Sequence, residues 1–322
     1  MTRFGYFLAS EQWGPRDLIW QAQRAQEAGF EALWLSDHFH PWTDQQGESP
    51  FVWSVLAVLA RETDLPIVTA VTCPTVRTHP VIIAHAAATT AVLADGRFVL
   101  GVGSGEALNE QVTGAPWPLA RQRLEMLAEA VDVMRQLWTG EVITHHGRYY
   151  TVEHARLYTL PDHPPPVFVS GLGPRAAEVA GQIGDGYICT TPDPDLVRIF
   201  DDSGGAGKPK QGGVKVCYGS DEQEAAKTVH RLWPNEGVPG ELAQVLRTPE
   251  HIMQAASLVT VEQLASAVTC GPDPARHADA LQEYVNAGFD DVFVNQIGPN
   301  QDDFFAFYEH EVLAELRTPS PR

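Results

Sequence analysis

The chain has 322 residues, 44% of them hydrophobic, which is enough to bury the core of one large α/β domain or of two smaller ones. Its 41 acidic residues exceed its 22 basic residues and give a formal net charge of -19, which argues against binding to nucleic acid or to a membrane surface. The four cysteines have no metal-ligand spacing, and no secretory signal or membrane-spanning run is present, so we expect a cytoplasmic protein with buried free thiols.

Strands and helices are predicted to alternate along the first part of the chain. Short apolar runs rich in β-forming residues predict strands, and apolar residues at helical spacing predict helices. The predicted strands are 4–8, 32–35, 66–72 and 98–102, and the predicted helices are 15–29, 51–61, 80–93 and 120–137.

The same alternation continues in the second part, with two interruptions. Residues 141–158 predict an inserted hairpin, and residues 191–213, rich in glycine and lysine after position 202, predict a flexible insertion loop that acts as a lid or is disordered. The remaining predicted strands are 167–170, 186–189, 214–218 and 292–295, and the remaining helices are 174–181, 221–233, 275–288 and 304–316.

Seven or eight strand-helix units favour a single α/β domain over residues 1–322, folded as a (β/α)8 TIM barrel. An open dinucleotide-binding sheet is the weaker interpretation. Residues 101–106 read GVGSGE, which puts Glu106 where the GxGxxG fingerprint requires its third glycine.

Polar or glycine-rich residues follow five of the predicted strands. In a barrel these positions converge on one face, where TIM-barrel enzymes carry their active sites. Each one alone has a structural explanation as a turn or a core histidine, but five together favour a site. The five segments are Asp37-His38, residues 73–75, residues 103–106 with Asn109, residues 170–174 and residues 190–191.

Two of these segments carry recognisable chemistry. His38 beside Asp37 suits proton transfer, because an imidazole titrates near neutrality. The GLGP run at residues 171–174 opens a predicted helix and offers free N–H groups to a phosphate. Asp37, His38, His40 and Asp44 can alternatively be interpreted as metal ligands, but adjacent residues of a strand face opposite sides and no further ligand has suitable spacing.

Longer motifs resemble those of a known family. The motifs SDHFxPW at residues 36–42, GVGSGEALNE at 101–110, MRQLW at 134–138 and GDGYICT at 184–190 closely resemble the F420-dependent glucose-6-phosphate dehydrogenase family. That family belongs to the bacterial-luciferase-like TIM-barrel superfamily, and the likeness spans most of the chain. The resemblance implies an oxidoreductase that binds coenzyme F420, an 8-hydroxy-5-deazaflavin that carries hydride.

The resemblance also implies roles for individual residues. His38 would take the proton of a substrate hydroxyl, Glu106 would be the acid-base partner of a cofactor ring nitrogen, and Trp42 would wall the reaction pocket. A non-proline cis peptide is implied at Ala70-Val71. Glu11, Trp42 and Thr190 are assigned to the substrate. The positions that match cofactor contacts are Asp37, Ala70, Val71, Cys73, Ser104, Asn109, Leu172, Gly173, Arg175 and Ala176, with Cys73 and Ser104 standing where the family has threonine.

One departure from the family concerns the substrate. The sugar-phosphate enzymes hold phosphate with a threonine, two lysines and an arginine, and a desolvated dianion needs such cations. Thr190 keeps the threonine, but Asp193, Gln254 and Ala280 stand at the other three positions. The sequence therefore predicts a neutral hydroxyl substrate, such as a secondary alcohol or an unphosphorylated sugar.

Three other functions are compatible with the sequence. They are an FMN-linked luciferase-like monooxygenase, a metal-dependent TIM-barrel hydrolase and a non-enzymatic binding barrel. Because enzymes of this fold family are commonly dimeric, the resemblance also implies a homodimer that acts on a small molecule.

Overall fold

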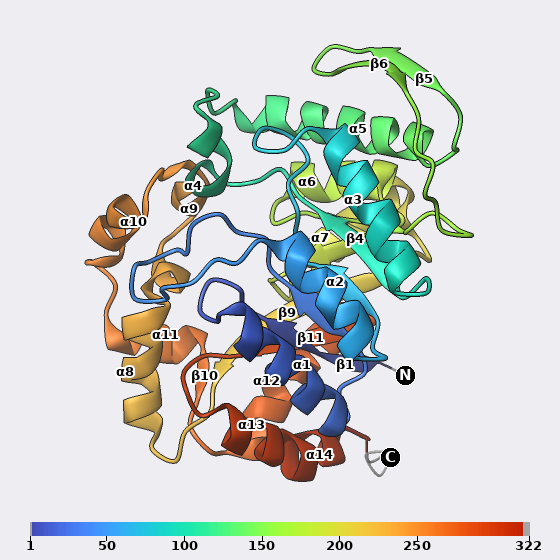
Figure 1. Ribbon diagram of the computed structural model, residues 1–322. Coiled ribbons are helices and arrows are strands. Elements are labelled where there is room, and N and C mark those ends of the chain that lie inside the picture. The colour runs from blue at the N-terminus through green and yellow to red at the C-terminus, as the bar shows by residue number, and fades with distance from the viewer. Residues whose placement is uncertain (1, 318–322) are drawn as a thin grey trace.

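Eight parallel strands form the centre of the protein, whose computed structural model describes residues 2–317 (Figure 1). Each strand pairs with two neighbours, and the ring closes where β8 pairs with β9. The predicted (β/α)8 barrel is therefore confirmed. In order around the barrel, the strands are β9 (Lys210–Cys217), β11 (Asp291–Gln296), β1 (Arg3–Leu8), β2 (Leu33–Leu35), β3 (Ile67–Thr69), β4 (Phe98–Val102), β7 (Val167–Ser170) and β8 (Gly186–Cys189).

Helices surround the strands (Figure 1). A proline at the first helical position begins several of them, because proline lacks an N–H that would have no partner there. The helices that follow barrel strands are α1 (Pro15–Glu27), α2 (Val52–Glu62), α3 (Pro80–Leu93), α5 (Ala120–Leu137), α6 (Pro174–Ile183), α8 (Glu222–Leu232), α12 (Pro274–Ala287), α13 (Gln301–Phe307) and α14 (Leu313–Arg317). Shorter helices are α4 (Ala107–Glu110), α7 (Pro194–Phe200), α9 (Leu242–Val245), α10 (Pro249–Ala256) and α11 (Val261–Ala267).

The barrel interior is filled by side chains. Trp34 stacks on Phe293 with ring centroids 4.5 Å apart, and the Trp34 indole N–H donates to Gln211 at 2.9 Å. Gly213 lies against the same indole, so closely that a Cβ atom there would lie 2.3 Å from the ring. The barrel is thus a packed core, and a ligand has room only beyond the strand ends.

Strand β9 changes its partner part way along one edge. Its first residues, 210–212, pair with β8, whereas Val216 and Cys217 pair with the two-residue strand β10 (Thr269–Cys270). The chain between β9 and β10 carries α8, α9, α10 and α11. It therefore leaves and rejoins the barrel at the same point of β9.

One inserted segment was predicted correctly and another was not. The hairpin is confirmed, with β5 (Ile143–His146) pairing antiparallel to β6 (Thr151–Ala155) at the edge of the molecule (Figure 1). The prediction of a flexible loop at 191–213 is wrong, because this segment forms α7, a π-helical turn at 201–205 and the start of β9. Buried Phe200 stacks on Tyr187, and Lys208 donates to two backbone carbonyls of the α6 end. Packing and capping thus order a segment whose composition indicated a loop.

Two further expectations concern cysteines and membranes. All four cysteines are free and buried, as predicted. Among residues 2–317, no helix combines the length and the apolar character needed to cross a bilayer.

Candidate active site

The first part of the site is a contact between His38 and Glu11. His38 lies just beyond β2, and its Nε2 atom is 3.2 Å from Oε1 of Glu11, which lies just beyond β1. Glu11 is only 2% exposed, and its other oxygen accepts a 2.6 Å hydrogen bond from the Ser36 hydroxyl. The Trp42 ring stands edge-on to the imidazole, with centroids 5.1 Å apart. Two residues assigned to the substrate, Glu11 and Trp42, thus contact the predicted proton-transfer residue.

Asn109 of α4 joins His38 to Glu106. Its Oδ1 atom accepts hydrogen bonds from the backbone N–H groups of Phe39 at 2.9 Å and His40 at 3.1 Å. Its Nδ2 atom lies 2.9 Å from Nδ1 of His38 and 3.5 Å from Oε2 of Glu106. The residues predicted to exchange protons with substrate and cofactor are therefore linked by a single amide.

A buried cluster of charged side chains, Asp37, Arg77 and Glu110, lies next to the His38 segment. Arg77 contacts Oδ1 of Asp37 at 2.8 Å and Oε1 of Glu110 at 3.6 Å, and its backbone N–H donates to Glu110 at 2.8 Å. The other oxygen of Asp37 accepts a 2.8 Å hydrogen bond from the Thr72 hydroxyl. Burial raises the pKa of Glu110 to about 7, although Arg77 opposes this effect. Both oxygens of Asp37, a predicted cofactor contact, are thus occupied within the protein.

The ends of β3 and β4 form a face with little side-chain bulk. The peptide bond between Ala70 and Val71 is cis, as the resemblance implied. A Cβ atom on Gly103 would lie 2.6 Å from Val71, and one on Gly105 would lie 2.6 Å from the Cys73 sulfur. Gly105 also has a φ of 78°, which favours glycine. Ala70, Val71, Ser104 and Glu106 are partly exposed here, so a flat ligand can approach the backbone.

The Cys73 thiol is buried next to this face and is not a reactive group there. Its sulfur lies 2.9 Å from the Thr75 hydroxyl. Burial raises the pKa of the Cys73 thiol well above its ordinary value. The thiol is therefore neutral and packs behind Gly105.

The N-terminus of α6 is open. Gly173 is its N-cap residue, no side chain caps the helix, and a Cβ atom on Gly173 would meet nothing within 4 Å. The first N–H groups of a helix have no partner within the helix, and they attract anions. Leu172 beside this end is 53% exposed, and Arg175 and Ala176 belong to the first turn. Four predicted cofactor positions therefore meet at one helix end.

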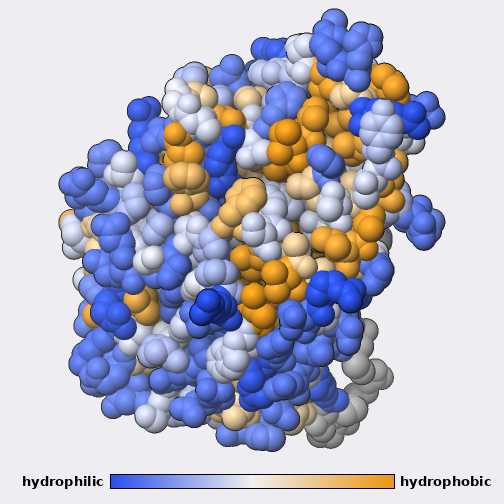
Figure 2. All heavy atoms as spheres, in the orientation of Figure 1, coloured by the Kyte–Doolittle hydropathy of each residue, from blue (hydrophilic) through white to orange (hydrophobic). Residues whose placement is uncertain are grey.

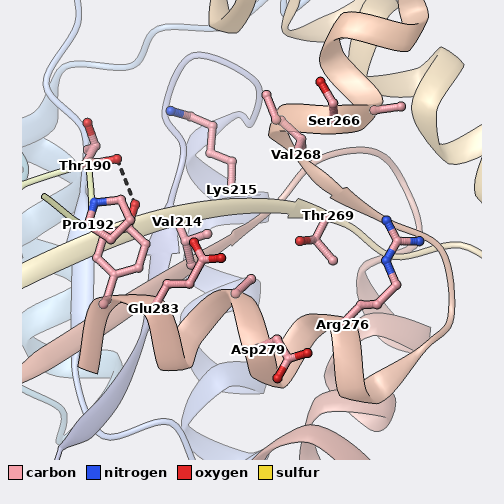
Figure 3. A pocket seen from close by; sticks show the side chains of 14 residues that line it. Thr190, Pro192, Val214, Lys215, Ser266, Val268, Thr269, Arg276, Asp279 and Glu283 are labelled. Carbon is pink, nitrogen blue, oxygen red and sulfur yellow. Dashed lines mark hydrogen bonds between the residues drawn. The ribbon is translucent and has the colours of Figure 1, made fainter. Parts of the chain in front are cut away.

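Thr190 shares no cavity lining with Glu11 and Trp42. It lines a cavity of about 360 Å³ between α11, α12 and the edge of β9, which contains none of His38, Glu106 and Trp42. In Figure 3, Lys215 comes from β9, whereas Arg276, Asp279 and Glu283 come from α12. The sequence assigned Thr190 to the substrate together with Glu11 and Trp42, but no contact between Thr190 and these two is present among the described residues.

Both cations of this cavity have acidic partners. Lys215 Nζ lies 3.1 Å from Glu236 and 4.9 Å from the centre of the Trp233 ring. Arg276 contacts Glu222 at 2.6 Å. Asp279 and Glu283 add two carboxylates to the lining. The cavity therefore has no excess of positive charge.

The three replaced phosphate-clamp positions belong to three different helices or their caps. Asp193 caps α7, because its carboxylate accepts from the N–H groups of Asp195 and Leu196. Gln254 is exposed on α10, and Ala280 lines the cavity. The acid at position 193 thus has a structural role that any helix start can require.

The residues of the alternative metal site are used otherwise. The His40 ring contacts the Leu108 carbonyl at 3.0 Å, and Asp44 is exposed. Across the part of the chain that the structure describes, no three His, Cys, Asp or Glu side chains are grouped as metal ligands.

Sequence reasoning missed Arg77, Glu110 and Lys215. Arg77 and Glu110 lie close to predicted segments, but only the fold brings them to Asp37, since 40 residues separate Arg77 from Asp37. Lys215 did give a signal, because a lysine between Val214 and Val216 interrupts an apolar strand. A charge in that position needs a partner, which Glu236 supplies.

Comparison with known sequences identifies relatives over the whole length. The luciferase-like monooxygenase family matches residues 2–291. An F420-dependent glucose-6-phosphate dehydrogenase of Microbacterium testaceum is 36% identical and aligns over 98% of this chain and 97% of its own. One of Amycolatopsis mediterranei is 33% identical over 98% of this chain and 99% of its own.

Solved structures give a consistent result. An F420-dependent secondary alcohol dehydrogenase, solved with an F420-acetone adduct, matches with a TM-score of 0.90 and 30% identity over 97% of this chain and 98% of its own. The F420-dependent tetrahydromethanopterin reductase of Methanopyrus kandleri matches with a TM-score of 0.78 but only 20% identity, so it supports the fold alone.

Proposed function

The chain belongs to the luciferase-like monooxygenase family, within the group that contains the F420-dependent glucose-6-phosphate dehydrogenases, and on this premise we propose that it is an F420-dependent oxidoreductase acting on a hydroxyl group. The observation that carries the proposal is the His38–Glu11 contact, which Asn109 links to Glu106. A proton-exchanging pair and a second carboxylate are what hydride transfer from an alcohol requires of the protein.

The residues at the strand ends fit this cofactor. Ala70 and Val71 offer a partly exposed face that a flat ring can approach, and glycine at position 103 lets the Val71 side chain pack directly against the backbone there. The open N-terminus of α6 at Gly173 suits the phosphate group of the cofactor. When bound, the deazaflavin supplies hydride chemistry that no side chain has.

The chain's own residues handle protons and geometry. The His38–Glu11 pair takes the hydroxyl proton of the alcohol, and Trp42 limits the position of the carbinol carbon. Glu106, which is partly exposed beside Gly105, holds or gives the proton needed at the cofactor ring. The buried Asp37–Arg77–Glu110 cluster keeps these loops in place.

The substrate is a neutral hydroxyl compound, either a secondary alcohol or an unphosphorylated sugar. A phosphate dianion needs free cations. Two positions of the family's phosphate clamp, Thr190 and Ala280, line the 360 Å³ cavity. Its cations Lys215 and Arg276 are already paired with Glu236 and Glu222. A glucose-6-phosphate dehydrogenase and a secondary alcohol dehydrogenase are both relatives, and the charges of this cavity favour the second type of substrate.

A substrate panel tests this proposal. Purified protein with coenzyme F420 is mixed with secondary alcohols, with glucose and with glucose 6-phosphate, and bleaching of the deazaflavin absorbance is followed. We expect bleaching with a neutral compound and not with the phosphate ester. A higher kcat/KM for glucose 6-phosphate would overturn the substrate class, and no bleaching with any hydroxyl compound would overturn the reaction.

A second candidate is an FMN-linked monooxygenase, because the matching family carries that name. Titration of the apoprotein with FMN and with coenzyme F420 distinguishes the two. Tight FMN binding with oxygen uptake would favour the monooxygenase, and we expect selective binding of the deazaflavin.

We also propose that the protein is a homodimer that pairs through α2 and α3. Apolar side chains are exposed together on this side of the molecule (Figure 2), and a patch of this kind marks an interface. The exposed large apolar side chains on or next to α2 and α3 include Phe51, Val58, Ile82 and Leu93. Light scattering should give a dimer that Ile82→Glu dissociates, whereas a monomeric parent protein would contradict the proposal.

The four buried free thiols support a cytoplasmic location.

A further inference from the structure

The side-chain amide of Asn109 can adopt only one orientation. Its Oδ1 atom faces two backbone N–H donors, from Phe39 and His40, at 2.9 and 3.1 Å. Turning the amide over would place an NH2 group against both donors and would place the oxygen against the Glu106 carboxylate. The Nδ2 atom must therefore be the group that faces His38.

This orientation decides the protonation of the His38 ring. An NH2 group only donates, so the Nδ1 atom of His38, 2.9 Å from Nδ2 of Asn109, must accept. The His40 carbonyl lies 3.2 Å from the same nitrogen and would favour a proton on it, but this contact is longer. In a neutral ring with an unprotonated Nδ1, the proton is on Nε2, which points to Glu11.

We propose that Asn109 is a positioning residue that holds His38 in the tautomer protonated on Nε2. The proposal rests on the proposed function only for its catalytic consequence. A nitrogen that already carries a proton cannot accept the hydroxyl proton, so His38 donates a hydrogen bond to the substrate oxygen. The group of the pair that can accept is the Glu11 carboxylate.

The step balances with Glu11 as the acceptor. The O–H bond of the alcohol breaks, its proton moves to Oε1 of Glu11, and the hydride of the carbinol carbon leaves to the deazaflavin as the carbonyl forms. His38 keeps its Nε2 proton throughout. The 3.2 Å between Nε2 and Oε1 allows one substrate oxygen to contact both atoms.

Asn109 itself is occupied inside the protein. The residue is 1% exposed, and both ends of its amide are engaged with His38, Glu106 and the backbone of residues 39–40. A role in orienting the two proton-exchanging residues therefore explains its contacts, whereas direct binding of the cofactor by its side chain would break them.

The test replaces the donor by an acceptor of the same shape. Asn109→Asp keeps an oxygen for the two backbone N–H groups but presents a second oxygen to Nδ1 of His38. Nitrogen-15 NMR of histidine-labelled protein, with His38 assigned through the missing signal of His38→Gln, reports which ring nitrogen carries the proton. We expect protonated Nε2 and unprotonated Nδ1 in the parent protein, and protonated Nδ1 in Asn109→Asp.

Turnover with coenzyme F420 is measured in the same variants. We expect Asn109→Asp to lower kcat for alcohol oxidation by about tenfold or more while the affinity for the deazaflavin changes little. Asn286→Asp, an exposed position on α12, is the matched control for the added charge and should change neither the NMR signals nor kcat.

The outcomes separate this inference from the proposed function. Protonated Nδ1 in the parent protein, or unprotonated Nδ1 in Asn109→Asp, would overturn the tautomer assignment even if alcohols are oxidised. The expected tautomers without any oxidation of hydroxyl compounds would overturn the proposed function and leave the role of Asn109 intact. The parent measurement decides the assignment even if the variant does not fold.

Discussion

The Glu11 carboxylate is held between Ser36 and His38, with one oxygen 2.6 Å from the Ser36 hydroxyl and the other 3.2 Å from the His38 ring. The Ser36 hydroxyl in turn accepts a 2.8 Å hydrogen bond from the backbone N–H of Ser10. The segments that follow strands β1 and β2 thus fix the direction of the carboxylate that we propose as the proton acceptor.

Replacing Glu11 by Gln should stop proton acceptance without removing bulk. An amide has no free negative charge, so we expect kcat for alcohol oxidation to fall by about 100-fold or more, with the dissociation constant of the deazaflavin changed little. Stopped-flow bleaching and fluorescence titration measure the two quantities. Glu141→Gln, exposed near the hairpin, is the control, and equal activity of the two variants would contradict the role of Glu11.

Replacing Arg77 by Ala should destabilise the fold. The change leaves two buried carboxylates, Asp37 and Glu110, without their cation, and breaking a buried ion pair costs about 3–5 kcal/mol. Urea unfolding measures the free energy of unfolding. Arg121→Ala removes a solvent-exposed pair with Glu125 and should change the free energy of unfolding far less, so similar losses in both variants would refute the support role.

The buried His277 side chain should lower the free energy of unfolding in acid. It is fully buried, with Nδ1 contacting the Tyr308 hydroxyl and Nε2 contacting the Gly271 carbonyl, and burial lowers its pKa from 6.5 to about 4. Between these values the unfolded chain binds a proton that the folded protein does not, so the free energy of unfolding falls as pH decreases from 6.5 to 4, by about 3 kcal/mol. His277→Gln should flatten this slope, whereas exposed His310→Gln should leave it unchanged when urea unfolding is repeated across this range.

The buried Glu110 side chain should give the free energy of unfolding a pH dependence of the opposite sign, over nearly the same pH range. Because burial raises its pKa from 4.5 to about 7, the folded protein holds a proton that the unfolded chain has lost between these values. Its contribution to stability therefore falls as pH rises from 4.5 to 7. Unfolding of Glu110→Gln should lack this decline, and a decline equal to that of the exposed control Glu309→Gln would argue against the assignment.

Replacing Gly173 by Asp should separate stability from cofactor binding. An aspartate can cap α6, which is worth roughly a few tenths of a kcal/mol over glycine, but its charge opposes an anion at the same helix end. We expect a higher Tm and about tenfold weaker binding of coenzyme F420. Gly173→Ala adds bulk without charge where no atom lies within 4 Å, so weak binding by both variants would point to a steric cause.

The sequence predicts regular elements well where one physical signal dominates. Strand β4, strand β8 and helices α3 and α5 begin and end at the predicted residues. The two strands are short apolar runs near glycine, α3 is an Ala-rich apolar segment that begins at Pro80, and α5 carries apolar residues at helical spacing. Residues 191–213 were mispredicted because local composition indicated a loop, whereas the burial of Phe200 and the capping by Asp193 decide the structure.

The site was predicted in part. His38, Trp42 and Glu106 follow from motifs, but their partners are set by contacts distant in sequence: 71 residues separate His38 from Asn109. The ion pair between Lys215 and Glu236 was not predicted either, because these two residues are also distant in sequence. The assignment of Thr190 to the substrate together with Glu11 stays a prediction, because a family motif gives residue identity but no distance, and Thr190 lines a cavity that Glu11 does not line.

Strand β9 pairs with β8 near its start and with β10 near its end, and this arrangement bears on which part of the protein can be exchanged. Val216 and Cys217 pair with Thr269 and Cys270, so the intervening segment enters and leaves the barrel at adjacent points. That segment carries Glu236, the partner of Lys215 beside the cavity. Because residues 265–268 of this segment also line the cavity, exchanging the segment would replace one wall of the cavity and leave the eight barrel strands unchanged.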